Sequence, residues 1–166
     1  MRKQLIIIVL LVGLLSVTYG FESTSTAASI GDEAPAFNVR NAQRTFAPNN
    51  HKGHYTLVAF WSSEDAQSRI NAAEYSRWYQ RFKSTNIIEY AAINLDEDPV
   101  LYHEIVRQDR LPDETQYYAG RALAQNIRAT YGISGRYGAV LIDPNGRIVA
   151  INPAKSSLEA LTITQS

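Results

Sequence analysis

The sequence predicts one α/β domain with a central mixed β-sheet flanked by helices on both faces. The chain has 166 residues, which is enough for a single domain with its own core. Its first half alternates strand-like and helix-like patterns, which predicts parallel strands joined by helices. A hairpin pattern near its end adds antiparallel strands. A mixed sheet is the arrangement that accommodates both.

The first strands and helix follow from runs of apolar residues. "YTLVAFW" (55–61) and "IIEYAAINL" (87–95) are short apolar runs typical of buried strands. Between them, 69–84 has a helical pattern. Four of its aromatic residues recur at helical spacing and are expected in the core: Tyr75, Trp78, Tyr79 and Phe82.

The remaining elements follow from start and stop signals. Asp98 is expected to cap a helix with Pro99 at its first position. A short strand is expected in 115–120, then a helix over 121–133 that ends near Gly132. Two strands about a Pro-Asn-Gly turn make a hairpin of 137–152. A last helix, "SLEALTI", is expected to be capped by Ser156 or Ser157.

The N-terminal residues predict export. Residues 1–20 combine Arg2 and Lys3 with an apolar run of about 13 residues, roughly 20 Å as a helix. A membrane-spanning helix needs about 20 residues, so a signal peptide fits better. Cleavage after Gly20 or after Ala27 satisfies the small-residue rule, and an uncleaved membrane anchor is the alternative. We expect a linker over 21–29 and the domain over 30–166, outside the cytoplasm in the periplasm or cell envelope.

Composition excludes several functions. There are 16 basic and 16 acidic residues; removing Arg2 and Lys3 leaves 14 against 16, a net of about −2. The basic residues are scattered, so no nucleic-acid partner is expected. The chain has no cysteine. It therefore has no disulfide, no thiolate nucleophile and no thiolate metal site.

Four segments carry a resemblance to a known family. They are "IGDEAPAFNV", "KGHYTLVAFWSSEDAQSR", "INLDED" and "YGISGRYGAVLIDPNGRIV", in that order. Together they resemble the thioredoxin fold, and more narrowly the extracytoplasmic TlpA/ResA-type thiol-disulfide oxidoreductases that border on the AhpC/TSA-like group. The resemblance covers about residues 30 to 160. It implies a thioredoxin-like fold and a site at the turn after the first long strand.

The resemblance also places the family's redox residues, and this chain departs from each of them. The two redox cysteines fall on Asp65 and Ser68, and the Trp before them falls on Glu64. Three further positions differ. Tyr137 stands where the family has its cis-proline, Ala59 where it has a buried acidic or amide residue, and Ala73 where it has a helix-kinking proline. Thiol-disulfide exchange needs a thiolate and a second sulfur, so the resemblance implies a redox-inactive relative.

The substituted positions have structural interpretations. Asp65 is expected to be an ordinary N-cap that accepts from the backbone N–H of Gln67 or Ser68. A catalytic carboxylate is the less favoured alternative. Ser68 has no histidine near it in sequence to activate it. Trp61 is expected in the core at a strand end, and Glu64 in a solvated turn.

Tyr137 and the histidines complete the candidate residues. The peptide bond before Tyr137 is expected to be trans, with the ring filling the groove or, alternatively, forming an aromatic wall for a ligand. His51 and His54 flank a polar loop with no third ligand at motif spacing, so no metal and no cofactor are expected.

Three functions remain open from the sequence. The first is a non-catalytic binding or scaffold domain that holds a protein or peptide in the cell envelope. The second is an enzyme without sulfur chemistry that uses Asp65, Glu64 or a histidine as acid or base. The third is a degenerate paralogue with a structural role. The first is favoured, and membrane contact is expected only through an uncleaved N-terminal segment.

Overall fold

A computed structural model describes residues 27–50 and 53–164. The predicted signal peptide, most of the predicted linker and His51 lie outside these residues, so the predictions about them are untested. Among the described residues, no helix has the length and apolarity to cross a membrane.

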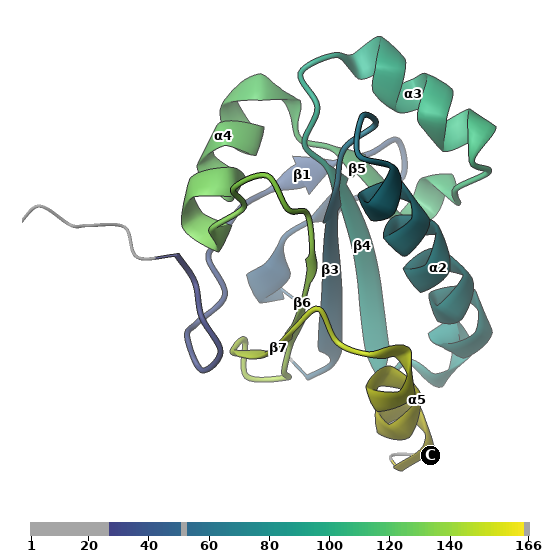
Figure 1. Cartoon of the computed structure of the whole chain (residues 1–166). Coiled ribbons are helices and arrows are strands. Elements are labelled where there is room, and N and C mark those ends of the chain that lie inside the picture. The colour runs from purple at the N-terminus through teal and green to yellow at the C-terminus, as the bar shows by residue number, and fades with distance from the viewer. Residues whose placement is uncertain (1–26, 51–52, 165–166) are drawn as a thin grey trace, which may run out of the picture.

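The centre of the molecule is a five-stranded mixed sheet in the order β5-β4-β3-β6-β7 (Figure 1). Its strands are β3 (Tyr55–Trp61), β4 (Ile88–Asn94), β5 (Gln116–Tyr118), β6 (Ala139–Ile142) and β7 (Ile148–Ile151). β3 pairs in parallel with β4, and β4 with β5, whereas β6 runs antiparallel to both β3 and β7. The predicted mixed sheet is confirmed.

Helices cover both faces of this sheet. They are α2 (Ala66–Phe82), α3 (Pro99–Gln108), α4 (Gly120–Tyr131) and α5 (Lys155–Thr164). α4 packs on the face that carries Val58 and Phe60. α2, α3 and α5 pack on the opposite face, which carries Leu57 and Trp61 (Figure 1). The alternation follows from the two-residue period of a strand buried on both sides.

A small hairpin was not expected from the sequence. It consists of β1 (Val39–Arg40) and β2 (Thr45–Phe46), which pair antiparallel. Asn41 closes its turn by accepting bonds from the backbone N–H groups of Gln43 and Arg44. The Asn41 amide also donates to the backbone carbonyls of Asp113 and Glu114, just before β5, and of Gln116, its first residue, at 3.3 Å. The hairpin is thus held against the edge of the sheet.

One helix start agrees with prediction and another differs from it. α2 begins at Ala66, as the predicted cap at Asp65 requires, and so extends the helical pattern of 69–84 by three residues. α5 begins at Lys155, so Ser156 and Ser157 lie inside the helix and neither caps it. The prediction of a serine cap there was wrong. The turn at Ala154 starts the helix earlier, since the backbone carbonyl of Ala154 accepts from the N–H of Ser157.

Candidate functional site

The turn between β3 and α2 is the candidate site. β3 is the central strand and ends at Trp61, and α2 begins at Ala66. Residues 62–65 therefore lie at the carboxyl edge of the sheet, where β4 also ends. In open α/β sheets this edge is where ligands bind.

Asp65 is the N-cap of α2. Its backbone is extended (φ −100°, ψ 101°), and its carboxylate accepts from the backbone N–H of Ser68 at 2.6 Å. Within the described part of the chain, the Asp65 carboxylate makes no other hydrogen bond, and neither His54 nor His103 reaches it. The predicted cap is confirmed. The geometry offers no base or acid partner for catalysis by this carboxylate.

Ser68 ties the turn to the first turn of the helix. Its side chain is buried. Its hydroxyl donates to the backbone carbonyl of Asp65 at 2.9 Å and accepts from the backbone N–H of Ser62 at 3.1 Å. A hydroxyl with its proton committed to a carbonyl has no base to activate it, so Ser68 is placed as a structural residue.

A buried carboxylate that the sequence did not single out holds the other side of the turn. Asp96 follows β4, is 8% exposed and accepts from the Ser62 hydroxyl at 2.6 Å. It also accepts from the backbone N–H of Ser63 at 3.0 Å and from the Asn94 amide at 2.8 Å. These bonds satisfy the buried charge and fix the turn against the neighbouring strand.

Asp96 could have been found from topology. Of the residues that follow β4, the sequence predicted a role only for Asp98, which does cap α3 by accepting from the N–H of Val100. Parallel β3 and β4 end at the same edge of the sheet, so polar residues after each strand are expected to meet there. That signal pairs Asp96 with Ser62 and Ser63.

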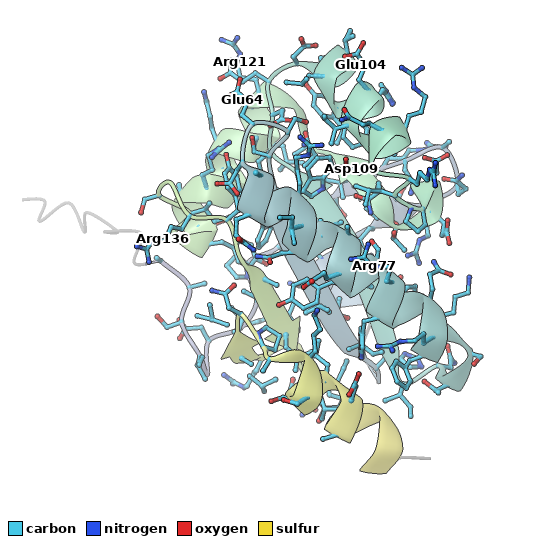
Figure 2. The ribbon with its side chains drawn as sticks, turned by 45° about the vertical axis from the view of Figure 1, so that its right-hand side comes forward. Glu64, Arg77, Glu104, Asp109, Arg121 and Arg136 are labelled. Atoms are coloured by element: carbon cyan, nitrogen blue, oxygen red, sulfur yellow. The ribbon has the colours of Figure 1, made fainter. Side chains whose placement is uncertain are left out.

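The residues beneath the turn are apolar. Ala59 is buried in β3 between Ala92 of β4 and Ala139 of β6, so no side chain there can carry a proton. Trp61 is fully buried, as predicted, and its ring centroid lies 6.0 Å from that of Tyr102. Burial raises the pKa of the Tyr102 hydroxyl, which therefore keeps its proton. Glu64 is exposed, as predicted for a solvated turn residue (Figure 2).

Tyr137 lies before β6, beside the end of β3. The backbone N–H of Phe60 donates to the carbonyl of Gly138 at 2.8 Å. The peptide bond before Tyr137 is trans, since no cis bond occurs in the described residues. The half-buried ring packs against the core on the α4 side, and the Arg128 guanidinium lies 5.2 Å from its centroid.

Part of the Tyr137 ring also lines a groove, so the two alternatives for it, a ring that fills the groove and an aromatic wall for a ligand, both stay predictions. This groove of about 280 Å³ runs between α2 and the segment before α5. Its other lining residues are mostly polar: Asn71, Glu74, Tyr75, Asn152, Pro153, Ala154 and Lys155. The Tyr75 hydroxyl donates to the carbonyl of Pro153, and Lys155 pairs with Glu74 at 2.7 Å. The polar groups of this groove are largely paired.

The residues described contain no cluster of three His, Asp or Glu side chains that could hold a metal ion. His54 belongs to the described chain but His51 does not, so the pair weighed in the sequence is not tested.

Comparisons with known proteins agree on the fold. No family model and no curated protein matches the chain. Solved structures do match. One is the thioredoxin domain of a thiol-disulfide oxidoreductase from Bacteroides vulgatus, with a TM-score of 0.72 and 22% identity over 82% of this chain and 99% of that one. The chain has a thioredoxin-like fold.

Two further structures support this assignment. A thioredoxin-like protein from Parabacteroides distasonis has a TM-score of 0.69 and 28% identity, over 81% of this chain and 96% of its own. A thiol:disulfide interchange protein from a Bacteroides species has a TM-score of 0.71 and 22% identity, over 83% and 93%. This thioredoxin-like chain has no cysteine, as a redox-inactive variant would. The assignment of its degenerate active-site positions stays a prediction. These positions are Ala59, Trp61, Glu64, Asp65, Ser68 and Tyr137.

Proposed function

We propose that this protein is an exported thioredoxin-like domain without thiol-disulfide redox activity, and that it binds a protein or peptide partner in the cell envelope. The observation that carries the proposal is the chemistry of the turn after β3. A capping carboxylate at Asp65 and a buried hydroxyl at Ser68 occupy it, and the chain has no sulfur nucleophile. Disulfide exchange requires a thiolate.

Binding is favoured over catalysis because the two carboxylates at the turn are engaged in holding its shape. The buried Ser63 hydroxyl is the exception at the turn, since it has no hydrogen-bond partner among the described residues. Asp65 caps a helix, and Asp96 accepts from Ser62, Ser63 and Asn94. A surface fixed in this way is preorganised for recognition. Export is supported by the N-terminal sequence, with its basic start and apolar run.

Two measurements test the proposal. In the insulin reduction assay with dithiothreitol, we expect the purified protein to leave the rate at background, with a thioredoxin as positive control. In a pull-down from envelope extract, we expect the folded protein to retain a partner that heat-denatured protein does not. A clear insulin rate, or no partner above the denatured control, would contradict the proposal.

A further inference from the structure

α2 presents an apolar stripe to solvent beside the candidate site. Ala66, Ile70 and Ala73 recur at spacings of four and three residues, so they lie on one side of the helix. Ile70 is 51% exposed. These residues, with Arg69, Arg77 and Asp109, line a cavity of about 430 Å³, which we call the α2–α3 groove.

An ion pair forms one wall of the α2–α3 groove. The Arg69 guanidinium donates to both carboxylate oxygens of Asp109, at 2.9 and 2.7 Å. This bidentate pair joins α2 to the end of α3 and neutralises both charges. The floor beside it is open to an apolar side chain, since Ala66 and Ala73 are small.

The remaining charge at the groove is positive. Arg77 is exposed and forms no ion pair within 4 Å among the described residues, although, after Lys155, its charge helps to lower the pKa of Glu74 (Figure 2). Arg110 does not line the groove, but it directly follows Asp109 in the chain, is exposed and forms no ion pair among the described residues. The nearby acid Glu74 is taken by Lys155 at 2.7 Å. An occupant with a carboxylate next to an apolar side chain matches this arrangement.

We propose that the α2–α3 groove docks an acidic, amphipathic segment of the partner protein, with an apolar side chain over Ile70 and a carboxylate at Arg77. The inference rests on the proposed binding function and names the face that the partner contacts. It differs from docking at the groove beside Tyr137, which is lined mainly by paired polar groups.

Site-specific photo-cross-linking tests the docking face. The photoreactive residue p-benzoylphenylalanine is placed at Ile70, at Tyr137 and, as a matched exposed control, at Val100, which is 63% exposed on α3. Each full-length variant is expressed in cells of the source organism, and the intact cells are irradiated. We expect a partner adduct from position 70 and none from position 100. Mass spectrometry of the adduct is expected to show an apolar residue flanked by Asp or Glu.

Charge reversal supplies the second readout. Arg77→Glu should reduce the adduct from position 70 by about tenfold, because like charges then face each other, whereas Arg77→Lys should retain it. Both changes fall on an exposed side chain, and unchanged thermal melting checks that the domain stays folded.

Each outcome separates the two proposals. Three results would overturn the docking inference and leave the binding function standing. They are an adduct only from position 137, an adduct with a second copy of this chain, and a cross-linked peptide without acidic residues. Insensitivity to Arg77→Glu would overturn it as well. A pull-down without any specific partner would overturn the proposed function and, with it, this inference.

Discussion

At the scale of single residues, Asp65 stabilises the protein through one bond, from its carboxylate to the Ser68 N–H. We expect Asp65→Ala to lower the free energy of unfolding by about 0.5–2 kcal/mol, the usual contribution of an N-cap. Asp65→Ser is the matched control, because a hydroxyl can accept the same bond and should retain most of the stability. Urea denaturation of both variants measures the difference. Equal losses of unfolding free energy in the two variants would show that the carboxylate does not act as a helix cap.

Asp96 should matter more than Asp65, because its bonds are buried. Asp96→Ala leaves the Ser62 hydroxyl, the Ser63 N–H and the Asn94 amide without their acceptor. A buried donor left unpaired costs about 1–3 kcal/mol, so we expect a loss of about 2 kcal/mol or more in urea denaturation. Glu97→Ala, at an exposed neighbour, should cost less than about 1 kcal/mol. Similar losses for the two variants would contradict the role of Asp96.

The contrast between these two acids shows what could be predicted at the site. The cap at Asp65 depends on residues within one turn of helix, so local sequence was enough. The contacts of Asp96 with Ser62 and Ser63 join residues 34 and 33 positions apart, through the pairing of two strands. Residue types alone did not indicate that pairing. The packing of Arg128 against Tyr137 was likewise not indicated.

At the scale of elements, α4 ends at Gly132, which adopts a left-handed conformation with φ 68°. A Cβ there would lie 2.5 Å from the Cβ of Ala27. Gly132→Ala should therefore cost more than the roughly 1–2 kcal/mol of left-handed strain. Gly135→Ala is the control: its φ is +80°, but nothing lies within 4 Å of the added atom.

The excess cost at Gly132 should come from the contact with Ala27. Adding Ala27→Gly to Gly132→Ala should then recover the difference between the two glycine variants in thermal denaturation. No recovery would mean that the N-terminal segment does not pack against the end of α4.

The turn of the β6–β7 hairpin should make stability depend on pH. Asp143 accepts from the backbone N–H groups of Arg147 and Asn145, both at 2.9 Å. These bonds, that to Arg147 first, hold the pKa of Asp143 below its ordinary 3.8. A lowered pKa stabilises the fold above the ordinary value and loses that contribution as pH falls through the folded-state value.

Comparison of urea midpoints between about pH 6 and about pH 2 tests this dependence. Asp143→Asn should destabilise the protein near neutral pH and weaken the loss in acid relative to the parent chain. An unchanged acid profile would show that other carboxylates govern it.

Which elements could be predicted depends on their length and their signals. β3 was predicted with its bounds because six of its seven residues are apolar and polar residues flank the run. Asp98, Pro99 and Gly132 marked helix ends through local backbone chemistry. The two-residue strands β1 and β2 carry too short a pattern to detect, and the Asn41 contacts with β5 that hold their turn span more than 70 residues.

At the scale of the whole molecule, introducing two cysteines tests whether the fold could still support thiol-disulfide exchange. We expect Asp65→Cys with Ser68→Cys to give weak insulin reduction, at least about tenfold below a thioredoxin control, because efficient exchange needs more than two thiols in place. Ala59 would still supply no proton-carrying side chain, and Tyr137 would still occupy its turn. Asp65→Cys alone is the matched control and should stay at background. Full activity of the double variant would show that sulfur was the sole loss.

The overall fold was predictable because its signals agree with one another. Alternating strands and helices, a late hairpin and four segments in the right order all indicated a thioredoxin-like arrangement, which the solved structures support. The proposed docking surface was not predictable. The α2–α3 groove depends on how two helices lie across the sheet. Nothing in the sequence distinguishes the exposed Ile70 from an apolar helix residue that packs in the core.

The closure of the turn by Asp96 and Ser68 has a consequence for the environment in which the protein works. Oxygen and nitrogen atoms make every one of these contacts, so neither oxidants nor reductants have a bond there to form or cleave. The shape of this turn, and its recognition by a binding molecule, should therefore be the same in aerated and in oxygen-free surroundings.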